Sequence, residues 1–401
     1  MPASEFTVVG GGIAGLVVAR RLAAAGRTVS LLEASDHLGG TVARHLVGGI
    51  DLDAGAESFA VRGGTVAALA KEVGLGDEIV APSAAGAWLQ PVTGPAVPLP
   101  ATSILGIPGT PLAKDVIAVI GTGGALRAQL DAVIPSLWAR QSLTLGRLVR
   151  RRMGNVVLEK LVAPVVHGVH SVHPDDLLLD RASPGLRAAF AREGSLAAAV
   201  RVLRDAAPAG SAVAGIRGGV HRLVTELAAD LAVYGVDVQL GRRVRSVDGL
   251  NGVVILATPL APSAGRTVVL VTLVVEAPEL DTAPRGTGVL VAQGAVGIRA
   301  RALTHSTAKW DWLRERADGR HVLRLSYDAE PADLAAVALQ DASALLGVRL
   351  PSPVDIARVE WSRSLEGAAD VGESVAGSGL AGIIAQANAT ADELLDDEKS
   401  G

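Results

Sequence analysis

The chain has 401 residues, of which 49% are hydrophobic and 19% charged, a composition that predicts two or three folded domains and excludes a disordered protein. It contains no cysteine, which excludes disulfides, thiolate catalysis and cysteine-ligated metals. The net charge of −4 and a longest basic tract of only three arginines, at 150–152, argue against nucleic-acid binding.

The segment 79–113 has no charge over 35 residues but contains seven prolines. A helix interior resists proline, so the segment predicts loops and short strands beside a cavity rather than a membrane span. The alternative is an apolar patch lying on a membrane surface, so peripheral membrane contact stays open. Since no basic stretch precedes the first expected strand, we expect no signal peptide and a cytoplasmic location.

The first 33 residues predict a strand, a tight turn, a helix and a second strand. The run 6–9 is rich in β-forming residues and ends in three glycines, 10–12. Apolar residues then recur at helical spacing over 13–25, and Gly26 can end the helix. The second strand covers 28–32 and stops at Glu33.

The rest of the pattern alternates between helical and extended stretches. A helix is expected over 66–73, and 111–204 is mostly helical with breaks at Pro135, Gly154, Pro164 and Pro184. Further helices are expected at 220–232, 334–346 and 381–395, and strands at 237–240, 253–258, 267–275, 288–292 and 321–326. The acidic tail Asp396-Asp397-Glu398 is expected to fray.

Gly10, Gly12 and Gly15 form the pattern G-x-G-x-x-G between the first strand and the first helix. In a dinucleotide-binding unit these glycines allow the tight turn, the approach of a pyrophosphate and close helix–strand packing. Glu33 stands where an acidic residue accepts hydrogen bonds from ribose. In a chain with 47 glycines the pattern alone is weak, and the alternative is a glycine-rich turn without cofactor. The complete strand–turn–helix–strand context favours the dinucleotide.

The residues after Glu33 favour FAD over NAD. Ala34 to Thr41, with the pair Gly39-Gly40, resembles the extended FAD signature of the flavin amine oxidase superfamily. Members usually carry arginines where His37 and Thr41 stand here. Because the glycines bring the backbone close to the cofactor, we expect the departures to matter little.

Further segments carry longer motifs. One is 50–59, which contains "G-A-E-S-F", and another is "H-S-T-A-K-W" at 305–310. The others are 99–100, 106–108, 151–154, 161–170, 218–219, 257–259 and 373–381. Together these segments resemble the protoporphyrinogen and coproporphyrinogen III oxidase family, and in particular its actinobacterial coproporphyrinogen III oxidases.

The resemblance implies an α/β fold: a doubly wound, Rossmann-like FAD-binding domain with a β-rich substrate domain and a helical lobe. The FAD-binding domain would be discontinuous, over 1–62, 211–262 and 366–398. The substrate-binding domain would cover 63–110 and 263–365, and the helical lobe 111–210.

The implied reaction is the FAD-dependent, six-electron oxidation of coproporphyrinogen III to coproporphyrin III in haem biosynthesis. Molecular oxygen would be the acceptor and hydrogen peroxide the by-product, and the product would be handed to a downstream haem-pathway enzyme. The alternatives are a protoporphyrinogen IX oxidase, another flavin amine oxidase or desaturase, and a non-catalytic FAD-binding relative. Two regions that are shorter than in relatives, 246–252 and 362–371, suggest the last.

The flavin would do the chemistry, so no catalytic side chain is assigned with certainty. Arg62 stands where relatives pair an arginine with a substrate propionate, and the alternative is a solvated surface arginine. The last helix would point its positive N-terminal end at the flavin. The implied FAD-contacting residues are Gly10, Gly12, Ile13, Ala14, Gly15, Glu33, Ala34, Gly39, Gly40, Thr41, Gly55, Ala56, Glu57, Val244, Ala257, Thr258, Gly377, Gly379 and Leu380.

Three other groups of residues are not assigned a function. His167, His170 and His173 recur every third residue, but Gly and Pro interrupt them and the resemblance places them in a structural turn, so no metal site is expected. The arginines at 150–152 could attract substrate carboxylates or an acidic partner, but a solvated helix face is favoured. Lys309 next to Trp310 is interpreted as packing rather than catalysis.

Overall fold

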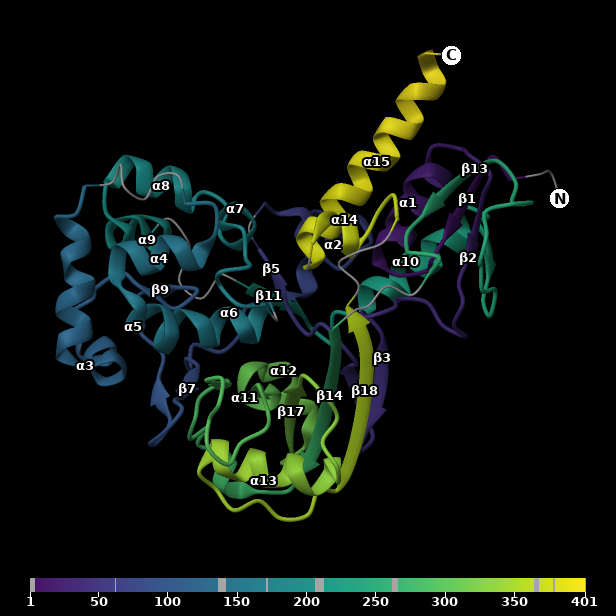
Figure 1. Cartoon of the computed structure of the whole chain (residues 1–401). Helices are drawn as coiled ribbons and strands as arrows, with labels where there is room; N and C mark the ends of the chain where they lie inside the picture. Colours follow the sequence, from purple (N-terminus) through teal and green to yellow (C-terminus); the bar gives the residue numbers. More distant parts are fainter. Residues whose placement is uncertain are drawn as a thin grey trace. The chain divides into compact units, whose positions relative to one another are not determined.

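The computed structural model describes residues 4–61, 63–135, 142–170, 172–205, 213–261, 266–363, 368–377 and 379–400. The chain divides into two compact units (Figure 1). The first unit comprises Met1–Pro82, Ser211–Val269 and Val359–Gly401, and the second comprises Ser83–Gly210 and Leu270–Arg358. The division into three domains stays a prediction.

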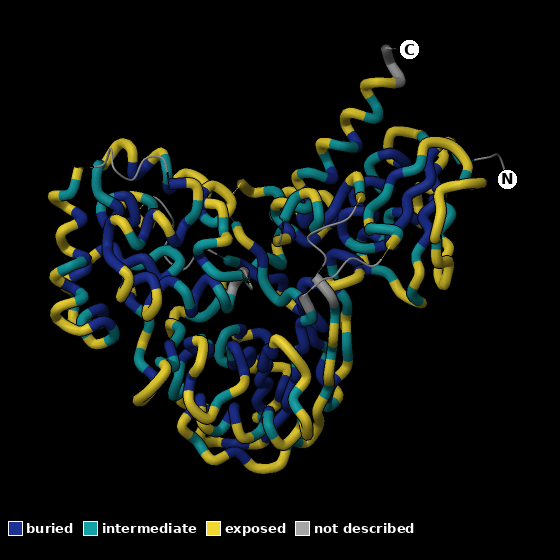
Figure 2. Tube along the Cα trace, in the orientation of Figure 1, coloured by how far each residue is buried: buried dark blue, intermediate teal, exposed yellow. Residues whose placement is uncertain are grey.

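A four-stranded parallel sheet lies at the centre of the first unit. Its strand order is β12-β2-β1-β13, with β1 Phe6–Val9, β2 Val29–Leu32, β12 Asp237–Gln239 and β13 Val253–Leu256. Every residue of β1 and β2 is buried, as expected for inner strands of a parallel sheet with both faces covered (Figure 2). The carboxyl ends of three strands therefore meet at one edge, with Val9 beside Leu32 and Leu256.

Helices cover this sheet. Helix α1 (Ile13–Ala24) packs against α10 (Arg222–Val233) and α15 (Leu380–Ser400), and α15 also packs against α2 (Thr65–Glu72). Apolar side chains of α1, α10 and α15 form one core with the strands. The helix does not end at Leu395 as expected: α15 continues through the acidic tail to Ser400.

The other elements of the first unit are short. A three-stranded antiparallel sheet has the order β5-β11-β6, and β3 and β4 form a hairpin. Their bounds are β3 Arg44–Val47, β4 Ile50–Asp53, β5 Phe59–Ala60, β6 Ile79–Val80 and β11 Val213–Ile216, with η1 at Gly76–Glu78 and α14 at Glu373–Ala376.

A seven-stranded sheet of order β18-β14-β17-β16-β15-β7-β8 lies mainly in the second unit, and the boundaries between the units fall within β14 and β18. The strands are β7 Trp88–Gln90, β8 Val97–Pro98, β14 Arg266–Val275, β15 Gly288–Val291, β16 Ala302–His305, β17 His321–Tyr327 and β18 Asp355–Arg363. Strands β16 and β18 of this sheet were not predicted from the sequence; β16 is short and leads directly into a helix. Strand β17 is buried throughout. The associated helices are η5 Pro278–Leu280, α11 Ser306–Lys309, α12 Asp311–Ala317 and α13 Leu334–Leu346.

The helical part of this unit surrounds its own apolar core. It contains α3 Lys114–Gln129, η2 Leu130–Ala132, α4 Leu145–Met153, α5 Asn155–Val157, η4 Leu158–Val162, α6 Ala163–His170, α7 Leu179–Ala182, α8 Leu186–Glu193 and α9 Leu196–Asp205. Gly154 ends α4 with a φ of 94°, as predicted. The predicted break at Pro164 is wrong: the helical run continues because the wider π-helical turn η4 precedes α6, and Pro164 falls in the first turn of α6.

The expectation of a solvated face for the arginines at 150–152 is wrong for Arg152. Its side chain is fully buried and forms an ion pair with Asp131 at 2.6 Å. Its guanidinium also donates to the backbone oxygens of Ile134 and Gly194. Arg150 instead pairs with Asp175 nearer the surface. Burial of Arg152 follows from its position on the inner face of α4.

The uncharged segment 79–113 forms loops and short strands, as predicted. Besides β6, β7 and β8 it contains β9 Ser103–Ile104 and β10 Ile107–Pro108, which pair with each other. Among the helices in the described part of the chain, none has the length and apolar character needed to cross a membrane.

Candidate functional site

The turn between β1 and α1 is built on glycine. Gly10 has a φ of 110°, which only glycine adopts readily, and Gly12 is the N-cap of α1. A Cβ on Gly15 would collide with the carbonyl oxygen of Gly10, so helix and strand touch here. A Cβ on Gly12 would meet nothing within 4 Å. Open space therefore lies in front of the N-terminus of α1, where helical N–H groups lack intrahelical acceptors.

Glu33 lies at the end of β2 and connects the strand to this turn. Its Oε2 accepts a hydrogen bond from the backbone N–H of Gly11 at 2.6 Å. Its Oε1 accepts from the backbone N–H and the hydroxyl of Ser35, both at 2.7 Å. Three donors thus fix the carboxylate at the edge of the glycine turn.

The second glycine pair lies beside the first. Gly39 donates to the carbonyl oxygen of Gly11 at 2.8 Å and forms a β-bridge with Gly12. A Cβ on Gly40 would lie 3.6 Å from the Cα of Gly12. The backbones of Gly11–Gly12 and Gly39–Gly40 therefore lie side by side, with no side chain between them.

The segment 55–57 packs behind this pair. A Cβ on Gly55 would collide with the carbonyl oxygen of Thr41, and Ala56 donates to the same oxygen at 3.3 Å. The hairpin β3–β4 places these residues, since Ala54 at its end donates to Ala43.

The ends of β12 and β13 border the same edge of the sheet. A Cβ on Gly10 would lie 3.1 Å from Cγ2 of Thr258, and Ala257 donates to Val9 at 2.8 Å. After β12, Arg242 donates to the carbonyl oxygen of Glu33 at 2.7 Å, two residues before Val244. The structure thus brings the predicted residues at 10–15, 33, 39–41, 55–56 and 257–258 together, with Val244 in the adjoining segment.

The turn before α15 contains Gly377 and Gly379, with φ of 77° and 116°. Gly379 accepts the hydrogen bond of Ile383 that opens the helix, so both glycines stand at its N-terminus, as predicted. Arg62 lies outside the described residues, and so does Ser378.

A buried carboxylate in this unit was not predicted from the sequence. Asp53 accepts hydrogen bonds from the backbone N–H of Val220 at 3.0 Å and of His221 at 2.8 Å, and it contacts Nδ1 of His221 at 2.8 Å. It joins β4 to the start of α10. The sequence feature that could have pointed to Asp53 is its position two residues before Gly55, within the segment 50–59.

In the second unit, a buried histidine pair was also missed. Nε2 of His305 lies 3.0 Å from Nδ1 of His321, whose Nε2 lies 3.2 Å from Asp281. Burial, followed by the nearby His321, lowers the pKa of His305 to about 3. Burial also lowers the pKa of His321, against the opposing effect of Asp281. Both rings are therefore neutral at neutral pH.

The other residues considered from the sequence have structural surroundings. His167 and His170 lie on α6 rather than in the expected turn, because the helix continues past Pro164. His167 contacts Asp328 at 3.1 Å. No group of His, Asp or Glu in the described ranges could hold a metal ion. The Lys309 ammonium lies 5.0 Å from the ring of the buried Trp310, which agrees with packing.

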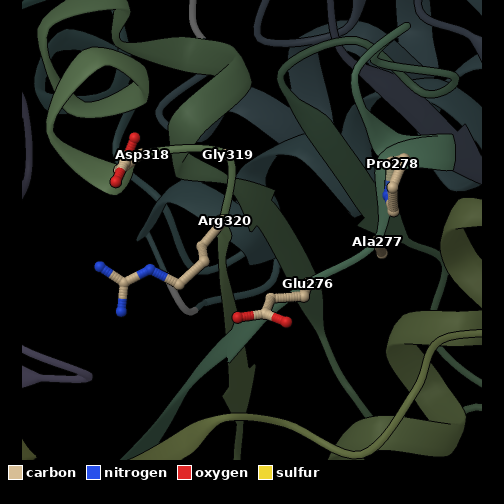
Figure 3. Close-up of a pocket in the computed structure, with 6 residues that line it drawn as sticks. All are labelled: Glu276, Ala277, Pro278, Asp318, Gly319 and Arg320. Carbon is tan, nitrogen blue, oxygen red and sulfur yellow. The ribbon is translucent and has the colours of Figure 1, made fainter.

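A surface depression of about 440 Å³ in the second unit does not coincide with the predicted site. It is lined by Glu276, Ala277, Pro278, Asp318, Gly319 and Arg320. Figure 3 shows the charged side chains of Asp318, Arg320 and Glu276 at this depression. None of these residues was predicted to bind cofactor or substrate.

Comparison with known proteins agrees with the resemblance. A family model described as flavin containing amine oxidoreductase matches residues 13–283. The coproporphyrinogen III oxidase of Mycobacterium leprae is 30% identical over 412 residues, covering 90% of this chain and 87% of that protein. The protein of the same name from Staphylococcus aureus is 25% identical and covers 82% of this chain and 79% of its own length.

Solved structures share the fold. A protein from Exiguobacterium sp. 255-15, solved as a candidate protoporphyrinogen oxidase, gives a TM-score of 0.82 at 22% identity, covering 98% of this chain and 99% of that one. Putrescine oxidase bound to putrescine gives 0.64 at 17% identity, with the same coverage. The predicted α/β fold is confirmed. The chain belongs to the flavin-containing amine oxidoreductase family and is an oxidase of that family.

Proposed function

We propose that this protein binds FAD and oxidises coproporphyrinogen III to coproporphyrin III, with molecular oxygen as electron acceptor. The observation that carries the proposal is the pairing of the glycine segments 10–12 and 39–40, whose backbones lie side by side without side chains between them. The carboxylate of Glu33 is hydrogen-bonded to the first of these segments. The names of relatives that match about nine-tenths of the chain supply the substrate.

The residues present fit the cofactor. A side chain on Gly12 would fill the open space before α1, so the site is shaped for a group that approaches the backbone closely. The first N–H groups of α1 would hold the pyrophosphate, and Glu33 would accept from the ribose hydroxyls. The remaining contacts would come from Gly39 to Thr41, Gly55 to Glu57, Val244, Ala257 and Thr258.

The N-terminus of α15 would stabilise negative charge on the reduced cofactor. This helix has 21 residues, and Leu380 begins it after two glycines that expose the backbone. The partial positive charge of a helix N-terminus favours an anion there. A bound flavin would supply the redox chemistry, accepting two electrons per turnover. The protein would contribute binding, orientation and this electrostatic field.

The overall reaction balances over three turnovers. Coproporphyrinogen III loses six hydrogens, and three molecules of oxygen become three of hydrogen peroxide. The four carboxylates of this substrate need cationic partners, and Arg62 is proposed as one. We further propose a cytoplasmic enzyme, with peripheral membrane contact open, that hands its product to a downstream haem-pathway enzyme.

Protoporphyrinogen IX is the second candidate substrate. The candidate protoporphyrinogen oxidase with a TM-score of 0.82 favours it, because that fold match extends over nearly the whole chain. The two substrates differ mainly in the number of carboxylates for which the pocket must provide cationic partners.

Porphyrin fluorescence tests the proposal. Purified protein supplemented with FAD is mixed in air with coproporphyrinogen III or protoporphyrinogen IX, and spontaneous oxidation is subtracted. Faster formation of coproporphyrin supports the proposal, and faster formation of protoporphyrin selects the second substrate. Retention of FAD without acceleration of either reaction would contradict both, and would favour another flavin substrate or a non-catalytic relative.

A further inference from the structure

The turn at 370–372 borders the candidate cofactor site. Gly372 has a φ of 114°, and a Cβ there would lie 3.2 Å from the carbonyl oxygen of Ala257 and 3.9 Å from Cβ of Ala14. The turn therefore packs against both the end of β13 and the first turn of α1. Its position helps to define the space in front of that helix.

One carboxamide on α15 holds this turn. Oε1 of Gln386 accepts from the backbone N–H of Gly372 at 3.2 Å, and its Nε2 donates to the carbonyl oxygen of Asp370 at 2.8 Å. Nε2 also donates to the hydroxyl of Thr390 at 3.1 Å. A reversed amide would place a donor against the N–H of Gly372, so the contacts fix its orientation.

The other side of the turn is fixed to β13. The backbone N–H of Asp370 donates to the carbonyl oxygen of Leu256 at 2.8 Å, and the Asp370 carboxylate accepts from the N–H of Leu256 at 2.8 Å. The turn is thus hydrogen-bonded between a strand of the sheet and a helix that packs on α1. Without Gln386, its hydrogen bonds to Gly372 and Asp370 would be lost, while the hydrogen bonds between the turn and β13 would remain.

We infer that Gln386 is a positioning residue for the cofactor site: it keeps the 370–372 turn against Ala257 and Ala14 without touching the cofactor itself. This inference rests on the proposed binding of FAD. A residue in this place must donate and accept at once, because the two backbone groups have opposite polarity. The glutamine carboxamide offers both a donor and an acceptor at neutral pH.

The test compares Gln386→Leu and Gln386→Glu with the control Asn388→Leu. Asn388 lies on the same helix, and its side chain makes no hydrogen bond in the described part of the chain. The first measurement is hydrogen exchange of peptides covering 368–377 in protein without FAD. The second is the dissociation constant of FAD together with the vibrational structure of its visible absorption band.

We expect Gln386→Leu to raise exchange in 368–377 about tenfold, with little change in α1, and to weaken FAD binding by about tenfold, the effect of roughly 1.4 kcal/mol. The control should match the wild type. Gln386→Glu should behave like the leucine variant at pH 7.5, because its second oxygen faces the carbonyl of Asp370. It should recover in part towards the wild type at pH 5.5, because the carbonyl oxygen of Asp370 beside the new carboxyl raises its pKa above the ordinary value of about 4.3 and favours the protonated form, which can donate.

The inference would be overturned if Gln386→Leu showed the same hydrogen exchange in 368–377 and the same dissociation constant for FAD as the wild type. It would also be overturned by exchange that rises equally over the whole of α15 and α1, since that would indicate general loss of stability. If the wild type itself fails to bind FAD, the proposed function is wrong, and the inferred role of Gln386 at a cofactor site is wrong with it. The exchange data would then report only on the turn.

Discussion

The carboxylate of Glu33 and the backbone N–H of Gly11 are joined by a hydrogen bond of 2.6 Å. Because Gly11 lies between the first two glycines of the G-x-G-x-x-G pattern, this contact ties the predicted ribose-binding residue to the predicted phosphate-binding turn. This hydrogen bond therefore fixes the two parts of the predicted site relative to each other.

Substitution of Glu33 should therefore weaken cofactor binding. Gln in its place keeps an acceptor for Gly11 but loses the charge that strengthens hydrogen bonds from ribose. A charge-assisted hydrogen bond contributes about 1.5–3 kcal/mol, so we expect FAD to bind about 10- to 100-fold more weakly. Titration of the apoprotein, followed by flavin fluorescence, gives the dissociation constant. An unchanged constant would remove Glu33 from the site.

Gly15→Ala should destabilise the first unit. The added methyl group meets the backbone carbonyl of Gly10, which cannot move aside as a flexible side chain could. Overpacking of this kind costs about 1–3 kcal/mol. Gly123→Ala in α3 is the matched control, because its Cβ would meet nothing within 4 Å. Chemical denaturation should show lower stability for the first variant and unchanged or slightly higher stability for the second.

The local parts of the site could be predicted from the sequence, since the glycine spacing and Glu33 lie within one strand–helix–strand unit. Contacts between distant segments could not. Asp53 and His221 are 168 residues apart, and nothing in the sequence near either one indicates the other. Arg152 was predicted to be solvated because it is one of three consecutive arginines. Consecutive residues of a helix point to different sides, however, and Arg152 lies on the inner side of α4. The helix continues past Pro164 because a π-helical turn precedes it, and such a turn has no clear sequence pattern.

Arg152→Met should strongly destabilise the helical part of the second unit. The change leaves the Asp131 carboxylate buried, with only 1% of its side chain exposed, and without its cation. Breaking one side of a buried pair costs about 3–5 kcal/mol. Arg150→Met is the control: its partner Asp175 is 37% exposed, so the loss should be about 1 kcal/mol or less. Equal urea midpoints for the two variants would contradict this assignment.

The histidine pair should make the protein sensitive to acid. The pKa of His305 is about 3 in the folded state, below its ordinary value near 6.5, so the folded protein keeps this ring neutral. Below pH 6.5 the unfolded chain binds a proton that the folded chain does not, and stability falls as the pH falls. One such group changes the free energy of unfolding by at most about 1.4 kcal/mol per pH unit.

His305→Gln removes the imidazole that takes up a proton in the unfolded chain. The glutamine side chain can still form a hydrogen bond with His321. We therefore expect a less steep loss of stability between pH 6.5 and 5 than in the wild type, even if the variant is less stable at pH 7.5. His37→Gln, at a histidine whose side chain is 59% exposed, serves as the control and should change the slope less than His305→Gln does. Denaturant titrations at several pH values give these slopes. Parallel curves for His305→Gln and the wild type would show that the buried pair does not govern the acid response.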